Sequence, residues 1–187
     1  MEWLALSIVL VFTNSVCLVS STKVEGSLIV DHFFRDYYGL VPSDAISGGK
    51  TEDGQVTYIG QFPVLNYLNG LRIDVVAATI MKGELKAFAP YNNSTVYSED
   101  VHIKILCARY PSEYRWYSPT QTYPPSCRYV TVGYEGTDLF VGKTTVGREE
   151  IIGKIYSNST NRPKGLIIPY KGGVSFPESY TVLTYCK

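Results

Sequence analysis

Apolar residues occur along this chain in short runs that end at glycine, proline, asparagine or serine, which is typical of β-strands. The clearest runs cover residues 56–62, 101–107, 138–144 and 179–186. Turn-forming residues bound each run, and the 16 tyrosines suit pleated, half-buried surfaces better than helices. The pattern therefore predicts an all-β protein with little helix.

The same landmarks occur twice in the same order, which indicates an internal repeat. The matched pairs are Phe34 with Trp116, Pro42-Ser43 with Pro125-Ser126, Gly48-Gly49 with Gly133, Tyr58-Ile59-Gly60 with Phe140-Val141-Gly142, Asn69-Gly70 with Ile152-Gly153, and Pro90-Tyr91 with Pro169-Tyr170. We therefore expect a first repeat over 22–108, a linker over 109–124 and a second repeat over 125–187.

Residues 1–21 have the pattern of a secretory signal peptide, because the apolar run 4–12 is followed by small and polar residues. The run is shorter than the roughly 18 to 20 apolar residues of a membrane-spanning helix. Cleavage after Ser21 or after Cys17 would leave small residues at the site. We expect a secreted, extracellular protein without membrane insertion, whose mature chain begins between Leu18 and Lys23.

Charge and motifs exclude several classes of function. Lys and Arg number 17, as do Asp and Glu, so no net charge favours nucleic acid or an anionic membrane. No nucleophile elbow, phosphate-binding loop, dinucleotide fingerprint or His-Glu-Xaa-Xaa-His pair occurs, and His32 and His102 are the two histidines. The sequence therefore predicts a non-enzymatic protein with no cofactor and no metal site.

The ordered landmarks resemble the DM-nine repeat family. The clearest matches are Gly39-Leu40-Val41-Pro42, Leu139-Phe140-Val141-Gly142-Lys143, Ile152-Gly153-Lys154 and Tyr180-Thr181-Val182-Leu183. The resemblance implies paired repeats that exchange β-strands into one compact intertwined β unit. Better-understood members look like mannose-specific lectins of invertebrate innate immunity, with a sugar site in each repeat.

The resemblance also implies a sugar-binding set of two acidic residues and one lysine. In the second repeat these positions match Glu135, Glu150 and Lys154, with Glu150 expected on a loop. Carboxylates accept hydrogen bonds from vicinal hydroxyls, and the ammonium donates to a further oxygen. The corresponding places in the first repeat are expected at Thr51, Tyr67 and Leu71, so the charged set is predicted in repeat two alone.

These features predict a glycoprotein that recognises glycans, such as those of microbial surfaces. The sequons begin at Asn92, Asn93 and Asn158, all in expected turns. A homodimer would place two sites on one particle and raise avidity. The alternative function is a secreted structural or protein-interaction module without sugar binding.

Three cysteines follow the leader, which gives one disulfide and one odd thiol in an oxidising compartment. Strand exchange would bring together the final strands of the two repeats, so we expect a Cys107–Cys186 disulfide, with Cys127 free or intermolecular. A Cys107–Cys127 bridge is the alternative, because it needs only closure of the linker.

Overall fold

The computed structural model describes residues 32–67, 70–122, 124, 126–157 and 163–186 as an all-β protein, as the sequence predicted. The strands are β1 (His32–Asp36), β2 (Ser47–Lys50), β3 (Val56–Asn66), β4 (Arg72–Met81), β5 (Ala87–Tyr91), β6 (Ser94–Tyr97), β7 (Lys104–Ala108), β8 (Tyr114–Tyr117), β9 (Arg128–Tyr129), β10 (Thr131–Tyr134), β11 (Asp138–Val146), β12 (Glu149–Ser157), β13 (Pro163–Tyr170), β14 (Gly173–Ser175) and β15 (Thr181–Tyr185). A short 3-10 helix, η1 (Pro111–Glu113), precedes β8. The expected signal peptide lies outside the described residues. In the described part of the chain, no helix has the length and hydropathy to cross a membrane.

The strands form one continuous hydrogen-bonded sheet whose order repeats between the two halves of the chain. β3 pairs with β2, β4 and β7, and β11 pairs in the same way with β10, β12 and β15. β1 pairs with β7 as β8 pairs with β15, which matches Phe34 with Trp116. β8 lies within 109–124, so this part of the expected linker has a counterpart in the first repeat.

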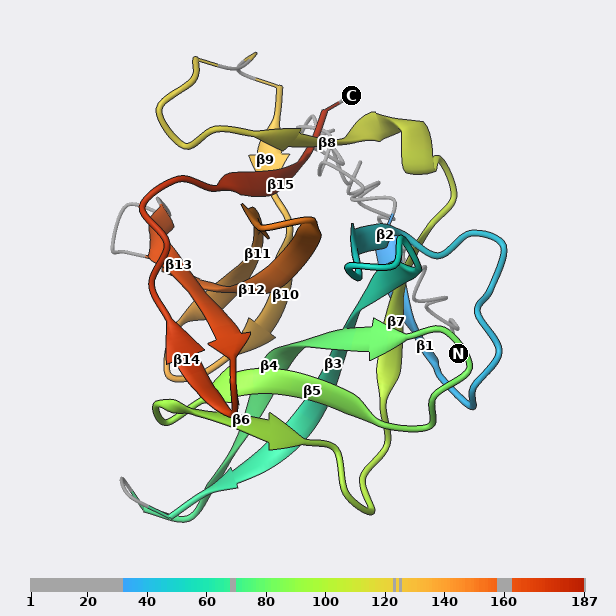
Figure 1. The fold of residues 1–187 in the computed structure, drawn as a ribbon, viewed down its shortest axis with the longest axis vertical. Helices are drawn as coiled ribbons and strands as arrows, with labels where there is room; N and C mark the ends of the chain where they lie inside the picture. Colours follow the sequence, from blue (N-terminus) through green and yellow to red (C-terminus); the bar gives the residue numbers. More distant parts are fainter. Residues whose placement is uncertain (1–31, 68–69, 123, 125, 158–162, 187) are drawn as a thin grey trace, which may run out of the picture.

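The two repeats exchange strands. β2 pairs with β12, β10 pairs with β4, and β14 pairs with β6, so each of these pairings joins one repeat to the other. Figure 1 shows β3 to β6 in teal and green below β11, β12 and β15 in orange and red, with β10 and β4 meeting between them. The strand pairings therefore show the intertwined unit that the family resemblance implied.

Two glycines permit this close exchange. A Cβ atom on Gly49 would overlap the backbone carbonyl of Glu150, and one on Gly133 would overlap the carbonyl of Val75. Glycine lacks that atom, so the exchanged strands approach each other closely at equivalent places in the two halves. This explains physically why the glycine landmarks recur.

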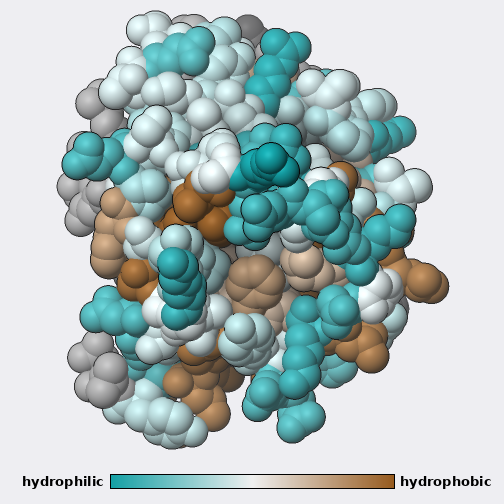
Figure 2. Space-filling view, viewed as in Figure 1, coloured by the Kyte–Doolittle hydropathy of each residue, from teal (hydrophilic) through white to brown (hydrophobic). Residues whose placement is uncertain are grey.

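The core consists of a central cluster shared by both repeats and one cluster in each repeat. The central cluster contains matched residues, such as Ile59 with Val141 and Leu106 with Leu183, all at most 1 % exposed. Burial of such aliphatic side chains is the main favourable contribution to folding. Figure 2 shows hydrophilic residues over most of one face, with apolar residues in separate patches between them.

The register of β12 corrects one of the expected matches. Gly142 pairs with Gly153 in the second repeat, and Gly60 pairs with Ala78 in the first. Gly153 therefore corresponds to Ala78 in β4 and not to Gly70, which precedes that strand. Glu150 and the Ile152-Gly153 pair all lie inside β12, so the expectation that Glu150 lies on a loop is wrong.

The expected Cys107–Cys186 disulfide is also wrong, and so is its Cys107–Cys127 alternative. Cys127 is bonded to Cys186, and Cys107 is a buried free thiol. The short β9, which follows Cys127, pairs with β15, which precedes Cys186, so the two cysteines lie side by side. By register Cys107 corresponds to Thr184, and it lies within the core of the first repeat.

Candidate functional site

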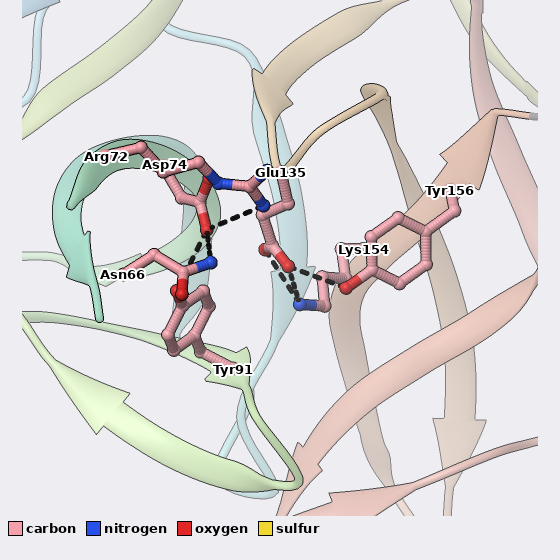
Figure 3. Close-up of polar contacts among 7 residues, drawn as sticks. All are labelled: Asn66, Arg72, Asp74, Tyr91, Glu135, Lys154 and Tyr156. Carbon is pink, nitrogen blue, oxygen red and sulfur yellow. Dashed lines mark hydrogen bonds and ion pairs between the residues drawn. The ribbon is translucent and has the colours of Figure 1, made fainter. Parts of the chain in front are cut away.

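The candidate site is centred on a buried ion pair in the second repeat (Figure 3). Lys154 lies on β12 and is 2 % exposed. Its Nζ lies 2.7 Å from Glu135 Oε1 and 2.5 Å from Oε2. Tyr156 donates its hydroxyl hydrogen to Glu135 Oε2 at 2.6 Å. The carboxylate therefore accepts from both neighbours, and such charge-assisted hydrogen bonds are the strong kind.

Local structure explains why these side chains meet. Glu135 lies in the short turn between β10 and β11, where its amide donates to the carbonyl oxygen of Thr137 at 3.0 Å. Gly136 adopts a φ of 77° there, a left-handed conformation that favours glycine. Lys154 and Tyr156 are two residues apart on a strand, so their side chains leave the same face of the sheet.

Aromatic rings from both repeats surround the ammonium of Lys154. Its Nζ lies 5.0 Å from the centre of the Tyr156 ring and 5.4 Å from the centre of the Tyr91 ring. Tyr91 belongs to β5 of the first repeat. Both distances are within the range of a cation–π interaction. The site is thus assembled from the two copies together.

A second polar cluster adjoins the ion pair through Tyr91. The Tyr91 hydroxyl donates to Asp74 Oδ2 at 2.9 Å, and Asn66 Nδ2 donates to the same oxygen at 2.7 Å. Arg72 Nε lies 2.8 Å from Asp74 Oδ1. Asp74 is 1 % exposed, and these partners compensate for the loss of water around its charge.

Burial and these contacts shift several pKa values. Burial raises the pKa of Tyr91 to about 12, and the hydrogen bond to Asp74 adds to the effect. Burial, followed by the bond to Glu135, raises the pKa of Tyr156. Burial lowers the pKa of Lys154, although Glu135 opposes the change. Burial alone would raise the pKa of Asp74, but the bonds from Asn66, Tyr91 and Arg72 outweigh it and lower the pKa.

A small cleft of about 240 Å³ opens beside the ion pair. Its lining residues come from β5, β12, β13, β14 and the turn after β5: Pro90, Tyr91, Asn92, Asn93, Lys154, Tyr156, Ile167 and Val174. Clefts that hold drug-sized ligands are usually larger, about 300 to 1,000 Å³. The space suits one small polar ligand unit with hydroxyl groups.

The structure brings together two of the three residues predicted to bind sugar. Glu135 and Lys154 are in contact, but Glu150 is elsewhere. It lies on β12, four residues before Lys154 and roughly 13 Å along the strand at the usual rise per residue. Glu150 makes ion pairs with Lys143 at 3.2 Å and with Lys50 at 3.7 Å. It lines a different, larger cleft.

Strand register also revises the first-repeat counterparts. Gly49 corresponds to Gly133, so Thr51 does occupy the position of Glu135. Thr79 occupies the position of Lys154, and Val75 that of Glu150. The expected places at Tyr67 and Leu71 are wrong, because they depended on matching Asn69-Gly70 with Ile152-Gly153. The first-repeat positions still lack the charged set.

Two of the predicted glycosylation positions are at the rim of the small cleft. Asn92 and Asn93 form the two-residue turn between β5 and β6, both exposed, with φ angles of 47° and 62°. Such a turn is common in hairpins and is well suited to asparagine. Asn158 lies outside the described residues.

Tyr156, Tyr91, Asp74 and Arg72 were missed by sequence reasoning. Tyr156 could have been found, because strand alternation from Lys154 places it on the same face. The Pro-Tyr repeat did mark Tyr91, as an element of architecture. Asp74 and Arg72 had no such signal, because their place beside the site follows from strand exchange.

Comparison with known proteins gave a family and a fold. The DM9 repeat matches residues 69–174 of this chain. A search of curated proteins found no match. The crystal structure of the nematode sperm cell motility protein MFP2B is similar, with a TM-score of 0.53 and 16% sequence identity. The similarity covers 83% of this chain and 45% of that one, and it concerns the fold alone.

Proposed function

The chain belongs to the DM9 repeat family, and from this premise we propose that it is a secreted protein that binds carbohydrate of the mannose type at the Glu135–Lys154 site. The observation that carries the proposal is the convergence of Lys154, two tyrosines and the Asn92-Asn93 turn on one small cleft, with Glu135 bonded to both Lys154 and Tyr156. The leader-like residues 1–21 and the Cys127–Cys186 disulfide support export, because disulfides persist in oxidising compartments.

The chemistry of the cleft suits a neutral polyhydroxyl ligand. The carboxylate of Glu135 can accept from sugar hydroxyls, and the ammonium of Lys154 can donate to a sugar oxygen. The rings of Tyr91 and Tyr156 offer flat apolar faces with polar tips beside those charges. Asn92 and Asn93 add amide groups at the rim.

Binding of one sugar unit should be weak. Glu135 and Lys154 already form an ion pair with each other. A sugar would therefore add hydrogen bonds to groups that already have partners and would not neutralise an unpaired charge. Each such bond contributes a net of about 1 to 3 kcal/mol, and a total of about 4 kcal/mol corresponds to a dissociation constant near 1 mM. Useful affinity for a glycan-coated surface would then come from several sites acting together, as in a homodimer.

A structural or protein-interaction module is the second candidate function. The observation in its favour is the burial of the pair: the side chains of Lys154 and Glu135 are 3% and 6% exposed. A buried pair whose partners satisfy each other can serve to hold the β10–β11 turn against β12. On this view the cleft would bind no sugar.

Titration of mannose into matched variants separates the two candidates. The double variant Glu135→Gln/Lys154→Met removes both charges together and avoids leaving one of them buried alone. We expect it to fold, to elute as wild type on gel filtration and to lose mannose binding. Leu71→Ala, at an exposed position, is the control and should bind as wild type.

If the folded double variant binds mannose as wild type does, the proposed site is wrong. If wild type itself shows no binding on a glycan array, the interaction-module function is favoured. Secretion is tested separately by N-terminal sequencing of protein from culture medium, where retention of Met1 would contradict export.

A further inference from the structure

A larger cleft of about 580 Å³ lies at the position that repeat symmetry relates to the candidate site. Thr51, Thr79 and Met81 line it where the first site has Glu135, Lys154 and Tyr156. Two short hydroxyl side chains and one flexible thioether replace three long polar ones. This exchange of long residues for shorter ones explains why this cleft is larger than the one beside Lys154.

The guanidinium of Arg72 at the candidate site has no counterpart in the larger cleft. At the candidate site, Asp74 holds the guanidinium of Arg72 and also accepts from Tyr91. By register Glu149 corresponds to Asp74. The β11–β12 ladder ends at Glu149 in the Gly147-Arg148 turn, whereas the β3–β4 ladder continues to the pair of Asn66 with Arg72. The carboxylate is therefore kept in the larger cleft, while the ladder position of Arg72, whose guanidinium pairs with Asp74, has no counterpart in the shorter β11–β12 hairpin.

Glu149 lines the larger cleft. Glu149 is half-buried and makes no hydrogen bond or ion pair with any described residue. A Cβ atom on Gly147 would meet nothing within 4 Å. Tyr170, the counterpart of Tyr91, lines the same cleft.

The floor of the cleft contains a second unused polar group. Thr79 is 5% exposed, and its hydroxyl has no hydrogen-bond partner among the described residues. Met81 and Phe88 form an apolar wall next to it. A cationic group with several donors can hydrogen-bond to Thr79 and pair with Glu149, and an apolar stem on that group can contact Met81 and Phe88.

The remaining charges are on the rim. Glu52 is exposed and adds a second carboxylate, while Glu150 is held by Lys143 and Lys50. Arg148 and Lys171 are exposed cations, and Lys171 Nζ lies 5.2 Å from the centre of the Tyr170 ring. Exposed charges are screened by salt more strongly than the half-buried Glu149 is.

We propose that this cleft binds an arginine side chain of a polypeptide partner, in the place that Arg72 takes in the other half of the molecule. The guanidinium pairs with Glu149, the Thr79 hydroxyl accepts a further N–H, and the aliphatic stem packs on Met81 and Phe88. A planar guanidinium has five donors and a weakly hydrated charge, which suits a carboxylate beside an apolar wall. The proposal does not depend on sugar binding at Lys154.

The test uses a blocked Gly-Arg-Gly peptide and the same peptide with citrulline, which has a similar shape and no charge. We expect saturable binding of the arginine peptide, measured by NMR chemical shifts, and binding of the citrulline peptide about tenfold weaker or more. Glu149→Gln should weaken binding of the arginine peptide by a similar factor. Glu178→Gln, at an exposed position outside the cleft, is the matched charge control and should bind as wild type.

Met81→Tyr provides a second variant. It introduces the tyrosine that the candidate site has at the equivalent position, Tyr156, and so narrows the cleft without changing its charges. It should also weaken binding. The Glu135→Gln/Lys154→Met variant should bind the arginine peptide normally, which separates this test from that of the sugar site. Equal binding of the two peptides, unchanged binding by folded Glu149→Gln, or no saturable binding to wild type would overturn the proposal.

Discussion

At the scale of single residues, the burial of Lys154 determines how the candidate site responds to mutation. An ammonium that is 2 % exposed is tolerated because Glu135 compensates it at 2.7 and 2.5 Å. Removing one charge of such a pair leaves the other buried without a partner, which costs more than removing both. The pair therefore has to be changed as a unit when function is studied.

Lys154→Met should lower the free energy of unfolding by about 3 to 5 kcal/mol, because Glu135 then remains buried without its cation and keeps the hydrogen bond from Tyr156. Adding Glu135→Gln should restore most of that loss. Urea denaturation of wild type, the two single variants and the double variant would measure the coupling. Additive losses in the double variant would show that the pair is not coupled.

Asp74 should make the protein sensitive to acid. Its pKa in the folded state lies below the ordinary value of 3.8, so the unfolded chain takes up the proton first as the pH falls. The stabilisation from Asp74 is complete above its unfolded pKa and is lost as the pH falls through the folded pKa. Asp74→Asn should be less stable than wild type at neutral pH, with a smaller difference at about pH 2.

The measurement is the urea midpoint of both proteins over that acid range. Asp138→Asn, which alters an exposed carboxylate, is the control. A stability difference between wild type and Asp74→Asn that does not change with pH would contradict the assigned role of the carboxylate.

At the scale of strands, sequence patterns predicted those elements whose signal is local. The runs 56–62 and 138–144 became parts of β3 and β11, and the glycine landmarks coincide with places where strands approach closely. Gly153 was misplaced, because a glycine inside a strand has the same local appearance as one in a turn. Because of this one misplaced glycine, the first-repeat counterparts of Lys154 and Glu150 were expected at Leu71 and Tyr67.

The disulfide illustrates what the sequence could not supply. Cysteine spacing allowed the correct pair, but choosing it required knowing that β9 pairs with β15. Likewise Tyr91 meets Lys154 only because strands from different repeats are exchanged. Long-range pairing of this kind depends on the whole fold and not on a local pattern.

The Cys127–Cys186 bridge should contribute strongly to stability, because its cysteines are separated by 59 residues. The loop-entropy relation gives about 4 kcal/mol for a loop of this length. The variant Cys127→Ser/Cys186→Ser should lose about that amount, as measured by denaturation. A non-reducing peptide map should show this pair linked, and a map that links Cys107 to either partner would contradict the structure.

At the scale of the whole molecule, strand exchange makes each repeat incomplete without the other. β2 and β10 each pair with a strand of their own repeat and with one of the opposite repeat, and the central cluster contains Ile46 next to β2 and Val132 in β10. Neither half alone can cover that cluster from water.

Fragments 22–108 and 109–187 should therefore be largely unfolded when expressed alone and should fold on mixing. Circular dichroism and NMR spectra of each fragment and of the mixture would show it. The control is the full chain cut between Glu84 and Leu85, in an exposed turn. The two pieces of this cut chain should stay together as a folded complex. A native-like spectrum from either fragment alone would refute the prediction.

Strand exchange also limits how the two clefts can diverge in evolution. The small cleft takes Tyr91 from the first copy and Lys154 from the second, while the larger takes Thr79 from the first and Glu149 from the second. After a duplication, neither copy inherits a complete site that it can alter in isolation. Each copy therefore contributes walls to both clefts. Loss or replacement of a whole copy would therefore change both clefts at once, whereas single substitutions can change one cleft at a time.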